Sequence, residues 1–155
     1  MRDLDKPVLT AIGVISGTSM DGIDVSIVES DGRERLSFGA GASYPYPPET
    51  RRALQALIAE AERAVTEPLQ ELEAAVTAAH LDAVRQFMTE QGIRSESVDL
   101  VGLHGQTVYH RPEIRFTRQL MDGPAVASAP GIPTAARCRR ADVAAGGEGA
   151  PLAPL

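Results

Sequence analysis

The sequence has only one cysteine, Cys138, and no long apolar run. A single thiol excludes an internal disulfide and is typical of a protein from a reducing compartment. No segment approaches the roughly 18 consecutive apolar residues that a membrane-spanning helix needs. The first residues include acids where a signal peptide has cations. We therefore expect a cytoplasmic protein that has no membrane partner.

Positive charge is also scarce, because 15 lysine and arginine residues stand against 21 acids, for a formal net charge of −6. Proteins that bind nucleic acid normally present a clustered basic face. The basic cluster in this chain comprises Arg137, Arg139 and Arg140, which we interpret as a solvated edge in preference to an anion site. We therefore expect no nucleic-acid partner.

The remaining composition is that of one globular domain. The 155 residues are 43% hydrophobic and 23% charged, which is within the usual range for soluble domains. A chain of this length buries roughly two-thirds of its unfolded surface and needs no crosslinks to do so. We therefore expect one folded unit with its own core.

Strand patterns come first in the sequence. An apolar run rich in β-branched residues occurs at 8–16, an alternating stretch follows at 23–29, and a third strand candidate lies at 36–43. The turn signals Asp21-Gly22 and Asp31-Gly32 separate them. Such spacing predicts a three-stranded antiparallel meander.

Helical patterns follow the meander. Residues 49–64 carry apolar side chains at helical spacing, and a second helix is predicted with Thr66 as N-cap, Pro68 in its first turn and Gly92 at its end. His80 lies beside the apolar stripe of this second helix. We expect it to be a structural histidine, because a stripe of this kind is core packing.

Shorter strands complete the pattern, with a covered strand at 98–103 and further candidates at 116–120 and 132–136. His104 is expected to begin a loop at the end of the covered strand, and the chain ends in a glycine-rich tract. The order of strands, helices and strands predicts an α/β fold with a mixed sheet and an antiparallel three-strand start.

The segment GTSMDGID between the first two strands is the main candidate for chemistry. It comprises Gly17, Thr18, Ser19, Met20, Asp21, Gly22, Ile23 and Asp24. Glycines at 17 and 22 allow positive φ and close backbone approach, so that successive N–H groups can converge on an anion. The two hydroxyls add donors, and Asp21 or Asp24 could hold Mg²⁺. An ordinary Asp-Gly hairpin turn explains the same residues equally well.

Two common phosphate loops, GxxxxGK[ST] and GxGxxG, do not occur. A subtilisin-like serine hydrolase is an alternative, with Ser19 as nucleophile and His104 as base. The order of these residues contradicts it, because that family has its histidine before its serine and places the serine at the start of a helix.

A second candidate site follows the strand at 98–103. His104, Gln106 and Thr107 lie where open α/β sheets bind their ligands, and imidazole, amide and hydroxyl groups suit the hydroxyls of a sugar. Asp142, in the tract before the glycine-rich end, is a further candidate. A polar loop without function is the alternative interpretation.

Three blocks of sequence together resemble the anhydro-N-acetylmuramic acid kinase family. They are SGTSMDGIDVSIVESDG at 16–32, GLHGQTVYHRPE at 102–113 and GIPTAARCRRADVAAGGEGAPLAPL at 131–155. The blocks have the order and spacing of that family, which is part of the sugar kinase, hsp70 and actin superfamily. The resemblance implies a ribonuclease H-like, actin-like ATPase lobe.

The resemblance also implies an activity. Such a kinase uses ATP and Mg²⁺ to open 1,6-anhydro-N-acetylmuramic acid with water and to phosphorylate O6, giving N-acetylmuramic acid 6-phosphate in peptidoglycan recycling. It implies that residues 17–24 bind the phosphates of ATP, and it suggests a homodimer. A non-catalytic module that binds nucleotide or sugar is the alternative.

The chain departs from the family pattern at several positions. Arg137 and Cys138 stand in place of an acid and an aromatic residue, Glu148 in place of a glutamine, and Met121 in place of a glycine. Glu148 would weaken ATP binding by repulsion if it faces the phosphates. We therefore expect Glu148→Gln to lower the dissociation constant for ATP.

Members of the family are more than twice as long, and their general base lies in a DTGP-like block that this sequence does not contain. We therefore expect residues 1–155 to be an incomplete N-terminal lobe of a two-lobed kinase, with the second lobe absent. Alone it is expected to be inactive and poorly soluble, because part of an apolar sheet face would be uncovered.

Overall fold

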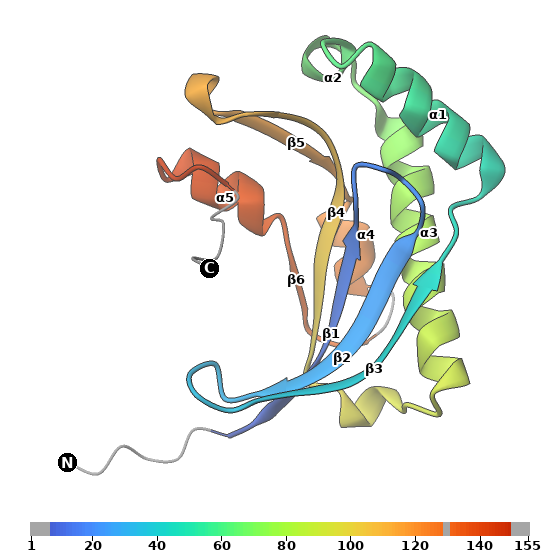
Figure 1. The fold of residues 1–155 in the computed structure, drawn as a ribbon, viewed down its shortest axis with the longest axis vertical. Coiled ribbons are helices and arrows are strands. Elements are labelled where there is room, and N and C mark those ends of the chain that lie inside the picture. The colour runs from blue at the N-terminus through green and yellow to red at the C-terminus, as the bar shows by residue number, and fades with distance from the viewer. Residues whose placement is uncertain (1–6, 129–130, 150–155) are drawn as a thin grey trace.

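A mixed β-sheet forms the centre of the computed structural model, which describes residues 7–128 and 131–149. Five strands run in the order β3-β2-β1-β4-β5, and β6 also pairs with β4 (Figure 1). Strand β4 is parallel to β1 and β6, and the other pairs are antiparallel. The strands are β1 Leu9–Ser16, β2 Ile23–Ser30, β3 Leu36–Tyr44, β4 Leu100–Arg111, β5 Phe116–Leu120 and β6 Thr134–Ala136.

Helices α1 and α3 cover one face of this sheet, and α5 lies on the opposite side (Figure 1). None of the helices in the described ranges is both long and apolar enough to cross a membrane. The helices are α1 Pro48–Ala59, α2 Arg63–Thr66, α3 Gln70–Glu90, α4 Gly123–Ser128 and α5 Cys138–Ala144, with short 3₁₀ turns at Ser95–Ser97 and Pro112–Ile114.

The core lies between the sheet and α3. Ile12 and Val14 of β1 alternate toward this face, as do Ile23 and Val25 of β2, and all are at most 3% exposed. Phe87 of α3 is fully buried against the same core. The predicted meander is therefore confirmed, because period-two alternation places one side of each strand under the helix.

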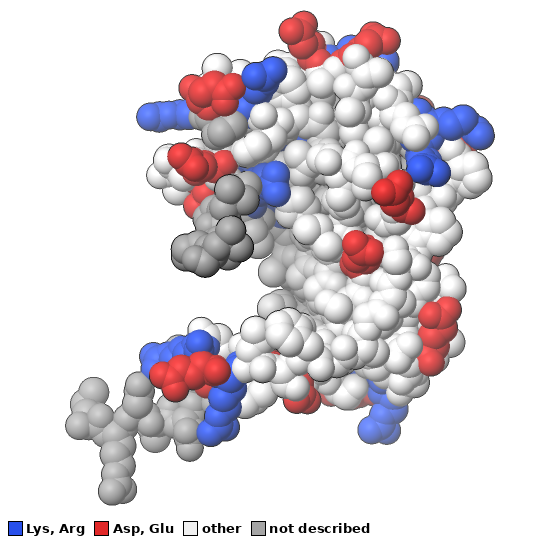
Figure 2. All heavy atoms as spheres, in the orientation of Figure 1, with Lys and Arg blue, Asp and Glu red and all other residues white. Residues whose placement is uncertain are grey.

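The other face of the β1–β2–β3 ribbon carries exposed apolar side chains. Leu9 and Ile15 are 45% and 51% exposed, and the strand register places Leu36 and Phe38 on the same face. Figure 2 shows a hollow, lined mostly by uncharged groups, between the part of the molecule that contains α5 and the part that contains the β2–β3 turn. The expectation of an uncovered apolar sheet face therefore holds for the described residues, and poor solubility stays a prediction.

The predicted helix at 49–64 is interrupted at residues 60–62, which separate α1 from α2, and the predicted start of the next helix is wrong. Helix α1 ends at Ala59, Thr66 ends α2, and α3 begins at Gln70 after Leu69, which has a φ of +53°. Pro68 thus lies in the connection between α2 and α3 and not in the first turn of a helix.

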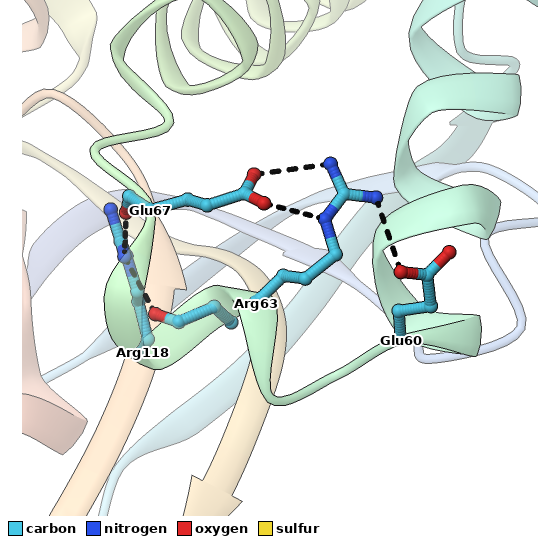
Figure 3. A network of polar contacts seen from close by, with 5 residues as sticks. Glu60, Arg63, Glu67 and Arg118 are labelled. Atoms are coloured by element: carbon cyan, nitrogen blue, oxygen red, sulfur yellow. Dashed lines mark hydrogen bonds and ion pairs between the residues drawn. The ribbon is translucent and has the colours of Figure 1, made fainter.

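The end of α2 and the connection to α3 are bound by a side chain from β5 (Figure 3). Arg118 of β5 donates to the backbone carbonyls of Ala64, Glu67 and Pro68 at 2.6, 2.7 and 2.8 Å. Carbonyls that a guanidinium satisfies do not need the N–H groups of a continuing helix. Arg63 also donates to both carboxylate oxygens of Glu67, at 2.7 and 3.1 Å.

The predicted loop at His104 is also wrong, because β4 continues to Arg111. Its second half pairs with β5 in antiparallel fashion, so the polar residues 104–110 lie within the sheet. The register against β1 shifts between Val14↔Leu103 and Ser16↔Gln106, which leaves two residues of β4 opposite one of β1. Gly105 occupies this bulge with a φ of +78°.

Candidate functional site

Residues 17–22 connect β1 to β2 in a tight turn. The N–H of Met20 donates to the carbonyl of Gly17 at 3.1 Å, and Met20 has a φ of +55°. Gly17 and Gly22 do not adopt the positive φ that glycine allows, and the left-handed residue of the turn is Met20, whose side chain is buried. Gly22 is needed for close approach, since a Cβ there would lie 2.5 Å from Ser43 Oγ and 3.2 Å from the carbonyl oxygen of Tyr44.

The polar side chains of this turn face solvent. Thr18, Ser19, Asp21 and Asp24 are all exposed, whereas Met20, Gly22 and Ile23 are buried. Asp21 Oδ1 lies 3.5 Å from Arg51 Nη2, with the two side chains 77% and 46% exposed. Such an exposed pair contributes little and leaves the carboxylate accessible. The turn is therefore held by its buried residues, while its polar side chains are exposed to solvent.

Gln106 lies directly beneath the turn and is fully buried. Its Nε2 donates to the carbonyls of Gly17 and Thr107, each at 3.2 Å, and its Oε1 accepts from the hydroxyl of Tyr46 at 3.1 Å. This amide connects β4 to the first residue of the turn. The structure thus separates Gln106 from His104 and Thr107, with which the sequence grouped it.

Ser16 and His80 extend this buried polar network. His80 Nδ1 lies 2.9 Å from the carbonyl of Val76. Since a carbonyl can only accept, Nδ1 carries the proton, and the unprotonated Nε2 lies 3.3 Å from the hydroxyl of Ser16, which also lies 3.4 Å from the carbonyl of Gly105. Burial lowers the pKa of His80 from 6.5 to about 4. The expected structural role of His80 is therefore confirmed.

The low pKa of His80 predicts a loss of stability in mild acid. Below about pH 6.5 the unfolded chain takes up a proton that the folded chain does not accept until about pH 4. The free energy of unfolding should therefore be about 2 kcal/mol lower near pH 5 than near pH 7 on account of this group.

Urea denaturation at the two pH values measures this effect. His80→Gln should remove most of the difference, whereas His110→Gln, which removes a histidine outside the core, should leave it in place. An unchanged difference in His80→Gln would show that other groups cause the acid sensitivity.

The side chains of His104 and Thr107 form no hydrogen bond to the side chains of this network, which meets β4 through the carbonyls of Gly105 and Thr107. His104 Nδ1 lies 2.8 Å from the carbonyl of Gly105, while its Nε2 is buried without a partner, as are Thr107 Oγ1 and Arg139 Nε. Burial lowers the pKa of His104, and the nearby charge of Arg139 adds to this shift. Each buried polar atom without a partner calls for an explanation, and a bound ligand is one such explanation.

Asp142 has a local role in the glycine-rich end of the described chain. Its Oδ2 accepts from the N–H of Gly149 at 2.8 Å, and its carbonyl accepts from the N–H of Gly147 at 2.9 Å. This carboxylate therefore shapes the loop after α5, in which Glu148 is exposed. Arg139, part of the cluster interpreted as a solvated edge, is half-buried, and no periodicity in the sequence indicates this.

Comparison with known proteins identifies the family. The family model for anhydro-N-acetylmuramic acid kinase matches residues 9–155. The chain belongs to this kinase family. The corresponding kinase of Bradyrhizobium diazoefficiens is 47% identical over 152 residues, which cover 95% of this chain and 41% of the relative. That of Nitrobacter winogradskyi is 46% identical over 151 residues, which cover 94% of this chain and 41% of the relative.

The chain thus spans about two fifths of the length of these curated relatives. The structure of RuvC from Thermus thermophilus aligns with 92% of this chain and 72% of its own, at a TM-score of 0.37 and 16% identity. Family membership confirms the expected ribonuclease H-like, actin-like ATPase fold class, and the strand order agrees with it. Membership of the kinase family argues against the serine hydrolase alternative. His104 Nε2 also has no hydroxyl partner of the kind that a hydrolase base needs.

Proposed function

We propose that this chain supplies the nucleotide-phosphate-binding part of an ATP-dependent anhydro-N-acetylmuramic acid kinase in the cytoplasm. The reaction opens the 1,6-anhydro ring with water and phosphorylates O6, giving N-acetylmuramic acid 6-phosphate for peptidoglycan recycling. The observation that carries the proposal is the family match over residues 9–155, which includes the exposed polar turn at the end of β1. Within the enzyme, residues 1–155 would form the N-terminal lobe.

ATP would supply the transferred phosphoryl group, and the turn at residues 17–24 fits its phosphates. The hydroxyls of Thr18 and Ser19 are exposed donors, and no hydrogen bond to another described residue occupies them. Gly17 is held from below by Gln106, so the rim of the turn is fixed before a ligand arrives. Binding and orientation of phosphates therefore need little rearrangement of this segment.

Magnesium would neutralise charge on the phosphates. The described residues contain no group of three or more metal-ligating side chains. Mg²⁺ nevertheless fits, because it usually keeps several waters and takes only one or two carboxylates beside phosphate oxygens. Asp21 and Asp24 are the accessible carboxylates of the turn, and we assign them to this role.

The sugar would bind on the side of β4 that carries His104 and Thr107. Because Nδ1 of His104 donates to the carbonyl of Gly105, its unpartnered Nε2 is an acceptor, whereas Thr107 Oγ1 can both donate and accept, and both suit the hydroxyls of a sugar. Asp142 supports the neighbouring glycine-rich loop. The proposal assigns no residue of this chain as general base.

Titration of the chain with ATP and Mg²⁺, followed through its backbone amide resonances, tests the proposal. We expect the largest shifts at residues 17–24, and about a tenfold weaker affinity in Thr18→Ala and Ser19→Ala, because hydrogen bonds to charged groups contribute about 1.5–3 kcal/mol. Ser37→Ala, an exposed serine of β3, is the control.

Shifts confined to other segments, or equal affinity in all variants, would contradict the assignment of the turn. Phosphorylation of the anhydro sugar by the enzyme that contains this chain then distinguishes a kinase from a non-catalytic binding module, which binds without turnover.

A further inference from the structure

A cavity of about 480 Å³ lies between β5 and α5. Four arginines line it, namely Arg115, Arg118, Arg137 and Arg140, and Glu73 is the carboxylate among its lining residues. The chain as a whole has a formal net charge of −6. The charge around this arginine cavity is positive and therefore opposite to that of the whole chain. None of the residues assigned above to ATP, Mg²⁺ or sugar lines it.

Arg118 lines the arginine cavity with a guanidinium that is held in position by hydrogen bonds. Its hydrogen bonds to the carbonyls of Ala64, Glu67 and Pro68 hold the guanidinium in place, and Figure 3 draws two of them. The neighbouring carboxylate of Glu67 is bound by Arg63 through both oxygens, so it is engaged elsewhere. Glu73 accepts the N–H of Met121 at 3.2 Å. The carboxylates of Glu67 and Glu73 near Arg118 therefore already have partners.

The other three arginines are not engaged by acids. Arg115, Arg137 and Arg140 are exposed, and none of them forms an ion pair with a carboxylate in the described part of the chain. Each also lies at a position where its charge can turn toward the cavity, since all three belong to its lining. Unpaired like charges gathered in one place repel each other until an anion joins them.

The backbone at two of these positions is strained. Arg115 precedes β5 with a φ of +55°, and Arg137 precedes α5 with a φ of +65°. This left-handed region favours glycine, and other residues found there concentrate at binding and catalytic sites. The chain uses glycine at comparable positions such as Gly32 and Gly92, with φ of +71° and +63°. Arginine at 115 and 137 therefore places a positive charge at the cavity, at positions where glycine would remove the backbone strain.

We propose that the arginine cavity binds a small phosphate-bearing anion. Planar guanidinium groups match phosphate oxygens in pairs of parallel hydrogen bonds. Three unpaired charges suit a phosphate dianion better than a single carboxylate, and the volume is within the range of small-molecule sites. Free inorganic phosphate and a sugar phosphomonoester share this chemistry.

Titration of the chain with inorganic phosphate and with glucose 6-phosphate, followed through the amide resonances of β5 and α5, tests this proposal. Uncharged glucose is the control ligand. The decisive variant is Arg115→Gly combined with Arg137→Gly, because it removes two guanidinium groups and relaxes both strained residues. We expect at least a tenfold loss of phosphate affinity with an unchanged or higher thermal midpoint.

The matched control is Arg52→Ala with Arg85→Ala, which removes two exposed arginines from α1 and α3. It should retain phosphate binding. Tighter binding of glucose 6-phosphate than of phosphate supports a phosphomonoester as the ligand, and equal binding supports free phosphate.

Four results would overturn the proposal. The first three are no binding of either anion by the unaltered chain, full binding by the double glycine variant, and equal loss in the Arg52 and Arg85 control. Thr18→Ala with Ser19→Ala should leave phosphate binding intact. Loss of phosphate binding in that variant would place the anion on the turn of residues 17–24 and would also overturn the proposal.

Discussion

Replacing Gly105 with alanine is expected to lower the free energy of unfolding by about 3 kcal/mol or more. A Cβ at this position would lie 2.8 Å from the carbonyl oxygen of Leu120 and 2.9 Å from Met121 Cβ. The φ of +78° adds strain for any residue with a side chain. Both the backbone of β5 and the conformation of β4 would have to change, so the loss is large.

Equilibrium denaturation in urea measures this loss, and Gly102→Ala is its matched control. Gly102 lies in the same strand, but a Cβ there has its nearest atom, the carbonyl oxygen of Ile12, at 4.0 Å. We expect a change below about 1 kcal/mol for this control. Similar losses in the two variants would show that the bulge at Gly105 is not a special position.

Replacing Gln106 with methionine is expected to weaken ATP binding about tenfold and to lower the free energy of unfolding by about 2 kcal/mol. Methionine keeps a similar volume but cannot donate to the carbonyl of Gly17. The first residue of the proposed phosphate-binding turn then loses its fixed position. The N–H groups that follow it would no longer be held in place for phosphate.

Tyr46→Phe is the control for this variant, because it removes the hydroxyl that donates to Gln106 Oε1 and keeps the bond to Gly17. We expect it to cost about 1 kcal/mol of stability with no change in ATP affinity. Calorimetric or resonance titration with ATP and Mg²⁺ compares the two. Equal ATP affinity in Gln106→Met and the unaltered chain would remove the positioning role, and so would equal weakening in Tyr46→Phe.

The roles of Gly105 and Gln106 are linked by the bulge in β4. The bulge at Gly105 shifts the register of β4, so that Gln106 comes opposite Ser16. On that face its amide meets the carbonyl of Gly17. Loss of the bulge would move Gln106 to the other face of the sheet, because one residue of slip reverses every side chain. Gly105→Ala should therefore weaken ATP binding as well as stability.

Much of the fold follows from local sequence. The meander is predicted because apolar alternation in β1 and β2 is interrupted by Asp-Gly pairs, and the strand at 116–120 coincides with β5. The turn after β2 also obeys its local chemistry, since Asp31 Oδ1 accepts from the N–H groups of Arg33, Glu34 and Arg35. Signals of this kind act within a few residues, so they can be read without a structure.

The sequence by itself thus determined the meander, the buried stripe of α3 with its structural His80, the position of the polar turn at 17–24 and, through its three motif blocks, the family. Only the tertiary structure decided how long β4 is, where α3 begins and which face Gln106 takes. These features depend on partners outside the segment itself, namely β5 for β4 and Arg118 for the end of α2. A pairing strand or a capping side chain from another segment leaves no periodic trace in the residues that it shapes.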